Sequence, residues 1–282
     1  MLRMNHFRSR VRAVPKWILA IVIAVAAVFP IWWMFNIVFT NPGVPASINP
    51  RLYPSSLSAG IQNIQKVLVE SQFLHSYLVT LAYTVLECLG VLLLCSMAAF
   101  EFALFQFPGK KFFFSIALLS LMVPSAVTLI PTYLLVVDLG WLNSMQGLVV
   151  PGLASAFGLF MLTQFMEDIP HDLLDAARVD GANHFRLYWH VALPLSKNAL
   201  VTLSILTFMS TWGNLLWPLV IATKPALYTV SRMVNWYNDP MSYTTVDVVM
   251  TANLLAAVPP VLFYLLFQRY VMKGITMTGL KG

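Results

Sequence analysis

Charged residues are scarce in this sequence. Asp, Glu, Lys and Arg make up 10% of its 282 residues, whereas a soluble domain carries about a quarter. Hydrophobic residues make up 59%, and the mean hydropathy is +0.76. One core surrounded by water cannot hold that much apolar surface. The composition therefore excludes an ordinary soluble domain and indicates a protein that lies in the lipid bilayer.

Cysteine is nearly absent, which excludes a disulfide framework. Cys88 and Cys95 lie seven residues apart in one apolar run, on one helix face and too far apart for a disulfide. We interpret both as small packing residues. The five histidines show no metal-ligand spacing, since His184 and His190 lie six apart, off the i,i+4 face; the others are His6, His75 and His171.

Catalytic and nucleotide-binding motifs are also missing. The sequence contains no nucleophile–base constellation, and its acidic residues are dispersed, so we do not expect an enzyme. Gly274 and Gly279 have the spacing of a phosphate-binding loop, but Leu280 stands where the lysine belongs. No cofactor is therefore expected on this chain.

Six apolar runs are long enough to cross a hydrocarbon core of about 30 Å at a rise of about 1.5 Å per residue. They span residues 17–39, 74–100, 112–137, 147–166, 198–222 and 247–270. The first run could pass for a signal peptide, but it is too long for one and lacks a convincing cleavage site. The sequence predicts a single all-α membrane domain over residues 1–282 with six transmembrane helices.

The positions of the basic residues predict the orientation of these helices. With the N-terminus inside, the inner segments hold 13 of the 17 Lys and Arg residues. Cytoplasmic loops carry such an excess, so both termini are expected in the cytoplasm. The net charge of +6 comes from residues at the edges of the apolar runs, and we expect no nucleic-acid partner.

A polar segment, "DAARVDGANHFRLYWHVALP" over residues 175–194, stands between the fourth and fifth runs. Pro170 suits the first turn of a helix, and Gly181 favours the left-handed conformation that stops one. Asn183 is suited to cap a second short helix that Pro194 ends. The pattern predicts two short helices in the cytoplasmic loop 167–197. They could pack on their own bundle or fit a groove on a partner.

This segment resembles the EAA loop of ABC importer permeases, and "IPHDLLDAARVDGANHFRLYWHVALPL" fits that motif closely. The likeness covers nearly the whole chain and narrows to carbohydrate-uptake permeases of the maltose-transporter type, in particular the shorter partner of the pair. The stretches that carry it are "AAFEFALFQFPGKK" (98–111), "LMVPSAVTLIPTYLL" (121–135), "WGNLLWPLVIA" (212–222), "FQRYVMKG" (267–274) and the ending "GITMTGLKG". Departures from the family pattern are Asp175 for Glu, Leu104 for Arg and Glu101 for Ala.

The resemblance implies a permease of the bacterial cytoplasmic (inner) membrane. Its partners would be a second permease, two ATPase subunits that bind ATP and Mg, and an extracytoplasmic solute-binding protein. The loop would be a coupling helix, and the cytoplasmic tail 271–282 would add a contact with the ATPase dimer. The coupling residues implied are Asp175, Ala176, Ala177, Asp180, Gly181, Phe185, Leu193 and Pro194; the tail residues are Thr278, Gly279 and Lys281.

Polar side chains recur on two of the expected membrane helices. Ser204, Thr207, Thr211 and Asn214 share one face of the fifth, and Tyr77, Thr80, Thr84 and Glu87 repeat that spacing on the second. Single hydroxyls in membrane helices often bond their own backbone. A carboxylate there costs about 3 kcal/mol, so Glu87 is expected to face the bundle interior or a wet cavity. The translocation path is therefore predicted along Ser204, Thr207, Thr211, Asn214, Thr84 and Glu87.

Several alternatives remain open from the residues alone. The solute could be a sugar, an oligosaccharide, a polyol, a glycerophosphate or an acidic oligosaccharide. An ion-driven secondary transporter would use Glu87 as its proton site. Of the outer loops, 40–73 could hold a binding protein or cap the bundle, and 223–246, with Trp236, Tyr237 and Asp239, is the better candidate for contact on the solute side.

Overall fold

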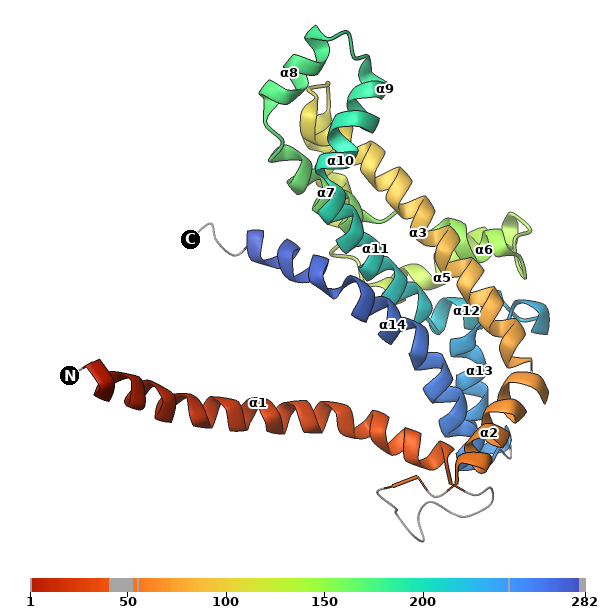
Figure 1. Cartoon of the computed structure of the whole chain (residues 1–282). Coiled ribbons are helices and arrows are strands. Elements are labelled where there is room, and N and C mark those ends of the chain that lie inside the picture. Colours follow the sequence, from red (N-terminus) through yellow and green to blue (C-terminus); the bar gives the residue numbers. More distant parts are fainter. Residues whose placement is uncertain (1, 41–52, 55, 71, 243, 279–282) are drawn as a thin grey trace. The chain divides into compact units, whose positions relative to one another are not determined.

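The computed structural model describes residues 2–40, 53, 54, 56–70, 72–242 and 244–278. All regular elements in these residues are helices, which confirms the predicted all-α class (Figure 1). The chain divides into two compact units. One comprises Met1–Phe73 and Val234–Ala257, and the other comprises Leu74–Met233 and Val258–Gly282.

The first unit is built around the end of a long apolar helix. Its elements are α1 (Leu2–Val38), α2 (Leu57–Gln65), the π-helical turn Lys66–Glu70, the 3-10 turn Pro240–Ser242 and the first part of α14 (Val246–Thr278). The buried side chain of Asn63 donates to the Val38 carbonyl at 2.8 Å, and the Ser56 amide donates to the Phe39 carbonyl at 3.0 Å. These bonds fasten α2 to the end of α1.

The second unit contains the polar segment and most of the apolar runs. Its helices are α3 (Phe73–Leu104, from Leu74), α4 (Lys110–Ser120), α5 (Ser125–Asp138), α6 (Met145–Val149), α7 (Ala156–Glu167), α8 (His171–Val179), α9 (His184–Leu187), α10 (Leu193–Leu195), α11 (Lys197–Trp212), α12 (Leu216–Ile221), the first half of α13 (Val230–Tyr237) and the second part of α14. Shorter turns are Val150–Gly152, Tyr188–Ala192 and Pro225–Leu227. Figure 1 shows α8 and α9 together at one end of α3 and α11.

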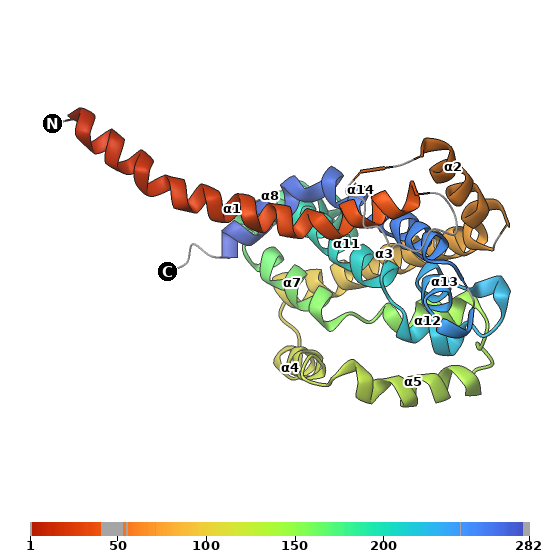
Figure 2. The same cartoon turned by 90° about the horizontal axis from the view of Figure 1, so that it is seen from below.

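The third apolar run is bent rather than straight. The axes of α4 and α5 differ by 102°, and in Figure 2 α4 is seen end-on while α5 runs across the view. Pro124 stands at the N-cap of α5, and a proline amide cannot continue the hydrogen-bond ladder of the preceding helix. The run 112–137 is therefore two helices joined at a sharp break, and the pair together still passes as one candidate span.

Among the described residues, three helical segments are each long and apolar enough to cross a membrane: Pro15–Val38, Phe73–Leu104 and Val246–Gln268. Three bent pairs also qualify, namely α4 with α5, Met145–Gly152 with α7, and His184–Leu195 with α11, which raises the count to six. The fifth helix ends at Trp212 instead of residue 222, and α14 continues past residue 270 to Thr278. The part of the chain that the structure describes is therefore that of a helical integral membrane protein.

Two buried clusters organise the second unit. The larger joins α3, α7, α11 and the polar segment through Val91, Cys95, Ala99, Phe100, Leu104, Leu162, Met166, Ile169, Leu174, Leu187, Tyr188, Ala192, Ala199 and Leu203. The smaller joins α3, α5, α6 and α12 through Tyr83, Val136, Leu148, Val149, Ile221 and Ala222. The two cysteines serve this packing: the Cys95 thiol donates to the Ser155 carbonyl at 3.4 Å, and Cys88 approaches the Ser204 carbonyl at 3.9 Å.

Candidate functional site

The polar segment begins with the helix–glycine stop that its sequence predicts. Pro170 occupies the N-cap of α8. Gly181 has a φ of +82°, and the Ala182 amide donates to the Ala177 carbonyl at 2.9 Å. This bond closes the end of α8 in the manner of a Schellman turn. A side chain at this position would meet no neighbour within 4 Å, so lack of space does not require the glycine. Its positive φ does.

The second short helix runs further than predicted. Asn183 caps α9 by accepting from the Arg186 amide at 2.9 Å, as expected. Helical turns then continue through the π-helical turn Tyr188–Ala192 and α10 to Leu195, where the chain bends by 75° into α11. Pro194 does not end the helix, because it lies in the first turn of α10, where a missing amide proton is tolerated.

One side of this hairpin is buried and forms its root. Leu174, Leu187, Tyr188 and Ala192 are at most 5% exposed and pack in the larger cluster. The Tyr188 hydroxyl lies 2.7 Å from the hydroxyl of Ser96 on α3, and the bond is buried. Any displacement of the hairpin therefore acts directly on α3, α7 and α11.

The other side is exposed and strongly apolar for a surface. Val179 is 87% and Phe185 66% exposed, and Leu173 and Trp189 are close to half exposed. The coupling residues from the sequence divide between the two sides. Asp175, Ala176, Asp180, Gly181, Phe185 and Pro194 are exposed, while Ala177 and Leu193 are partly buried against the root. Such an exposed apolar surface is typical of a protein–protein contact.

The family departures Glu101 and Leu104 have structural roles at this root. Glu101 Oε1 pairs with Nε2 of His184 at 2.5 Å, and the rings of Phe100 and Phe105 pack on the imidazole with centroids 5.2 and 4.4 Å away. Leu104 is 8% exposed and belongs to the larger cluster. The C-terminal end of α3 is thus tied to the start of α9.

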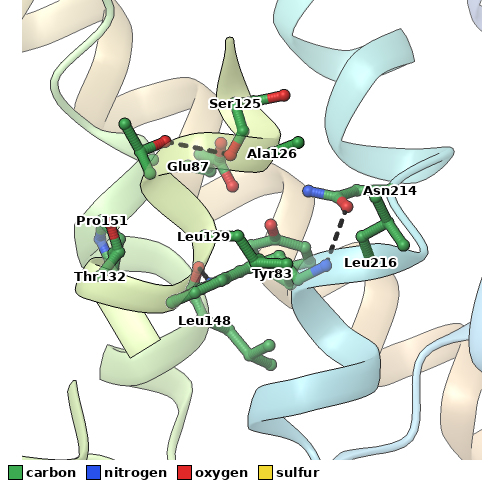
Figure 3. A pocket seen from close by; sticks show the side chains of 13 residues that line it. Tyr83, Glu87, Ser125, Ala126, Leu129, Thr132, Leu148, Pro151, Asn214 and Leu216 are labelled. Atoms are coloured by element: carbon green, nitrogen blue, oxygen red, sulfur yellow. Dashed lines mark hydrogen bonds between the residues drawn. The ribbon is translucent and has the colours of Figure 1, made fainter. Parts of the chain in front are cut away.

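A cavity of about 310 Å³ with both polar and apolar lining residues lies elsewhere in the same unit, between α3, α5, α6 and α12 (Figure 3). Its lining residues are Tyr83, Glu87, Ser125, Ala126, Thr128, Leu129, Thr132, Leu148, Pro151, Gly152, Asn214, Leu216 and Trp217. The Glu87 carboxylate lies beside the Tyr83 and Thr211 side chains. Its Oε2 atom is buried without a hydrogen-bond partner in the described part of the chain.

The predicted polar stripes are only partly at this cavity. Glu87 and Asn214 line it, and the hydroxyls of Thr84 and Thr211 are buried without partners among the described residues. Asn214 is not on the fifth-helix face, since α11 ends at Trp212. Ser204 and Thr207 lie outside the lining: the Ser204 hydroxyl donates to the Val201 carbonyl of its own helix at 2.7 Å, and Thr207 is buried.

Tyr77 and Thr80, the first two residues of the predicted polar stripe on α3, make packing contacts. The Thr80 hydroxyl donates to the Ser76 carbonyl at 2.7 Å and accepts from the Val230 amide at 2.8 Å. The Tyr77 ring packs edge-on against Trp212. These contacts fasten α3 to α11 and α13, and neither side chain lines the cavity.

The hydroxyls of α5 are the cavity residues that the sequence reading missed. Ser125, Thr128 and Thr132 are spaced by three and four, which places them on one helix face. That spacing is visible in the sequence and could have predicted a polar wall. Trp217 also forms part of the lining, and its indole N–H donates to the Gly147 and Leu148 carbonyls at 3.1 and 3.2 Å.

Predictions for the outer loop and the tail have mixed outcomes. Trp236 is 54% exposed, but Tyr237 is buried beside Phe73, so the expectation of two exposed aromatics there is wrong for Tyr237. An amphipathic helix explains the difference, because adjacent residues of α13 point to different sides. Thr278 is the last residue of α14, whereas Gly279 and Lys281 lie outside the described residues.

Comparison with known proteins identifies the family. The sequence profile described as "Binding-protein-dependent transport system inner membrane component" matches residues 90–277. The chain belongs to this family. It is 34% identical over 232 residues to the sn-glycerol-3-phosphate transport system permease protein UgpE of Brucella melitensis, covering 80% of this chain and 79% of that one. The UgpE protein of Rhizobium meliloti is 32% identical over 269 residues, covering 90% and 92%.

The fold of this permease is also found in a solved structure. A chain from a bacterial ABC transporter involved in the import of the acidic polysaccharide alginate matches with a TM-score of 0.82 at 24% identity, covering 93% of this chain and 96% of that one. The family resemblance drawn from residues 175–194 is confirmed. The permease is a multi-pass inner-membrane component of an ABC importer.

Proposed function

We propose that this permease is one of two membrane subunits of an ATP-driven importer for a sugar or a related polyhydroxyl solute. A second permease, two ATPase subunits and an extracytoplasmic solute-binding protein complete the assembly, and ATP and Mg bind to the ATPase subunits. The exposed apolar face of the α8–α9 hairpin carries this proposal. Relatives named for sn-glycerol-3-phosphate transport support a small, hydroxyl-bearing solute.

The hairpin transmits ATPase closure to the membrane helices. Val179 and Phe185 dock in a groove on the ATPase, and the buried root passes the displacement to α3 and α11. α3 runs unbroken from Ala99, which packs with the root in the larger cluster, to Glu87 at the cavity, a distance of about 18 Å for twelve residues of helix. A rigid helix of that length can couple the two regions and so drive alternating access.

Both chain termini are proposed to lie in the cytoplasm, as the distribution of Lys and Arg favours. The tail residues Thr278, Gly279 and Lys281 then reach the ATPase dimer. The cavity around Glu87 and Asn214 is the part of the translocation path that this chain supplies. Of the predicted path residues, Ser204 and Thr207 act in helix packing instead.

Gly181 provides the test of coupling. A β-branched residue at its φ of +82° is strained by about 1–2 kcal/mol, so Gly181→Val distorts the hairpin without touching a neighbour. We expect Gly181→Val to lower solute-stimulated ATP hydrolysis at least tenfold in the purified complex while the chain still inserts. Gly181→Asn, which tolerates this conformation, is the matched control and retains most of the activity.

Wild-type stimulation in Gly181→Val would contradict the proposed coupling role. A chain that purifies without an ATPase subunit and moves solute in vesicles without ATP would instead favour the ion-driven alternative. Mass spectrometry of the subunits that co-purify in mild detergent separates these outcomes.

A further inference from the structure

The cavity has an acidic side chain and no basic one in the lining that the structure describes. Its described lining contains one carboxylate, Glu87, and no Lys, Arg or His side chain. Figure 3 shows Glu87 at the cavity beneath Ser125, with Tyr83 and Asn214 nearby. In a region of low dielectric, one carboxylate has a far larger effect on a charged ligand than it would have in water. An anionic group that enters the cavity therefore meets the Glu87 carboxyl group and no cation in the described lining.

The surrounding structure holds the carboxylate at this position. Glu87 lies in the unbroken interior of α3, and Gly152 leaves the room that it fills, because a Cβ atom at Gly152 would overlap the carboxylate. The Tyr83 side chain interacts with both Glu87 and Asn214. Oε2 of Glu87, buried without a partner in the described chain, remains available to accept a hydrogen bond.

The other polar groups of the lining are hydroxyls and an amide. Ser125, Thr128 and Thr132 supply hydroxyls from one face of α5, and Asn214 supplies its amide. Because the Trp217 N–H is already bonded to backbone carbonyls, its ring adds apolar surface rather than a donor. Acceptors, hydroxyls and an aromatic wall suit a polyhydroxyl group, whose O–H groups donate and whose C–H faces pack on rings.

We propose that this cavity takes an uncharged polyhydroxyl portion of the transported solute and rejects anionic groups, with Glu87 as the residue that determines the selection. The inference rests on the proposed function and names its solute class. A phosphomonoester or a uronate would place a second negative charge beside Glu87 without a cation in the lining to offset it. An anionic part of a solute would therefore have to bind outside this cavity.

Thiol chemistry tests the charge selection without knowledge of the solute. In the assembled transporter with Cys88 and Cys95 replaced by Ala, Thr128→Cys places a thiol in the cavity wall. Its reaction rates with a cationic methanethiosulfonate (trimethylammonium) and an anionic one (sulfonate) are divided by their rates with free 2-mercaptoethanol. We expect the cationic reagent to be favoured at least about tenfold.

Glu87→Gln in the same background is the matched control, and it should bring the ratio close to one. A ratio near one with Glu87 present, or an equal ratio in both chains, would overturn the inference. If Thr128→Cys reacts with neither reagent, Ser125→Cys is measured next, and silence at both positions would show that the cavity is closed to solutes and also overturn it.

Failure of this inference is distinguishable from failure of the proposed function. The thiol ratio requires neither ATP nor solute, whereas the Gly181 variants report ATPase coupling. Charge selection in a chain that lacks an ATPase partner would support the inference about the cavity and contradict the proposed importer function. Coupled ATP hydrolysis without charge selection would support the importer function and contradict the inference about the cavity.

Discussion

Asp175, Glu101 and Leu104 are the positions at which the sequence departs from the family pattern, and each is accommodated by a specific contact. Asp175 Oδ1 accepts from Nη1 of Arg178 one helical turn later, at 2.8 Å. Glu101 pairs with His184 on the α8–α9 hairpin, and Leu104 packs in the larger buried cluster.

The Ser96–Tyr188 bond predicts an asymmetric pair of mutations. The Ser96 hydroxyl also approaches the Leu93 carbonyl at 3.1 Å, so Tyr188 is the donor to Ser96. Tyr188→Phe leaves Ser96 with its backbone partner and should cost about 1 kcal/mol. Ser96→Ala leaves a buried Tyr188 hydroxyl unpaired and should cost about 2 kcal/mol. Unfolding in detergent, followed by tryptophan fluorescence, measures both.

Ser204→Ala is the control. The Ser204 hydroxyl donates only to the Val201 carbonyl of its own helix, and such a bond contributes little to stability. We expect this variant to unfold close to the wild type. A larger loss for Tyr188→Phe than for Ser96→Ala would contradict the assigned direction of the hydrogen bond. Equal, negligible losses would show that the bond does not anchor the hairpin.

At the scale of elements, the Glu101–His184 pair connects α3 with α9, and a double-mutant cycle tests it. Both side chains are about half exposed, so we expect a coupling energy of about 0.5 kcal/mol, in the range for exposed pairs. Glu101→Ala, His184→Ala and the double variant are compared by thermal unfolding. Strictly additive losses would mean that the pair does not hold the two helices together.

Asp175 and Arg178 provide the matched control for that cycle. Their ion pair lies within α8 and joins no second element. Because Asp175 is also one of the implied coupling residues, this pair is compared by thermal unfolding alone, where we expect a coupling energy of about 0.5 kcal/mol or less. A larger coupling energy for Glu101–His184 would show that joining two helices adds to the stabilisation.

Most helices of the second unit could be predicted from apolar runs, caps and glycines, and the bends could not. Gly181 and Asn183 mark their helix boundaries locally, so sequence alone located them. The 102° bend before Pro124 and the continuation past Pro194 depend on neighbouring turns. Proline alone marks a break in one case and a first turn in the other.

The cavity shows the same limit. Glu87 stood out because a carboxylate in an apolar run is expensive, and it lines the cavity. Thr128 and Trp217 are brought to it only by the bend of α5 and the separate helix α12. Helix periodicity gives the face on which a residue lies, but tertiary packing decides what that face meets.

At the scale of the whole molecule, the coupling hairpin and the α2 segment should lie on opposite sides of the membrane. Thirteen of the 17 basic residues fall in segments assigned to the cytoplasm, and such segments are retained on that side during insertion. This distribution predicts the hairpin inside and α2 outside. Each region offers an exposed position for labelling: Val179 on the hairpin and Ser58 on α2.

Cysteine labelling with a membrane-impermeant maleimide measures this orientation in a chain whose Cys88 and Cys95 are replaced by Ala. We expect Ser58→Cys to react in intact spheroplasts and Val179→Cys to react only in inside-out vesicles. Co-expression of the ATPase subunits should then slow Val179→Cys labelling severalfold, because docking covers the apolar face. Labelling of Val179→Cys in intact spheroplasts would contradict the predicted orientation. It would also mean that a cytoplasmic ATPase cannot reach the hairpin.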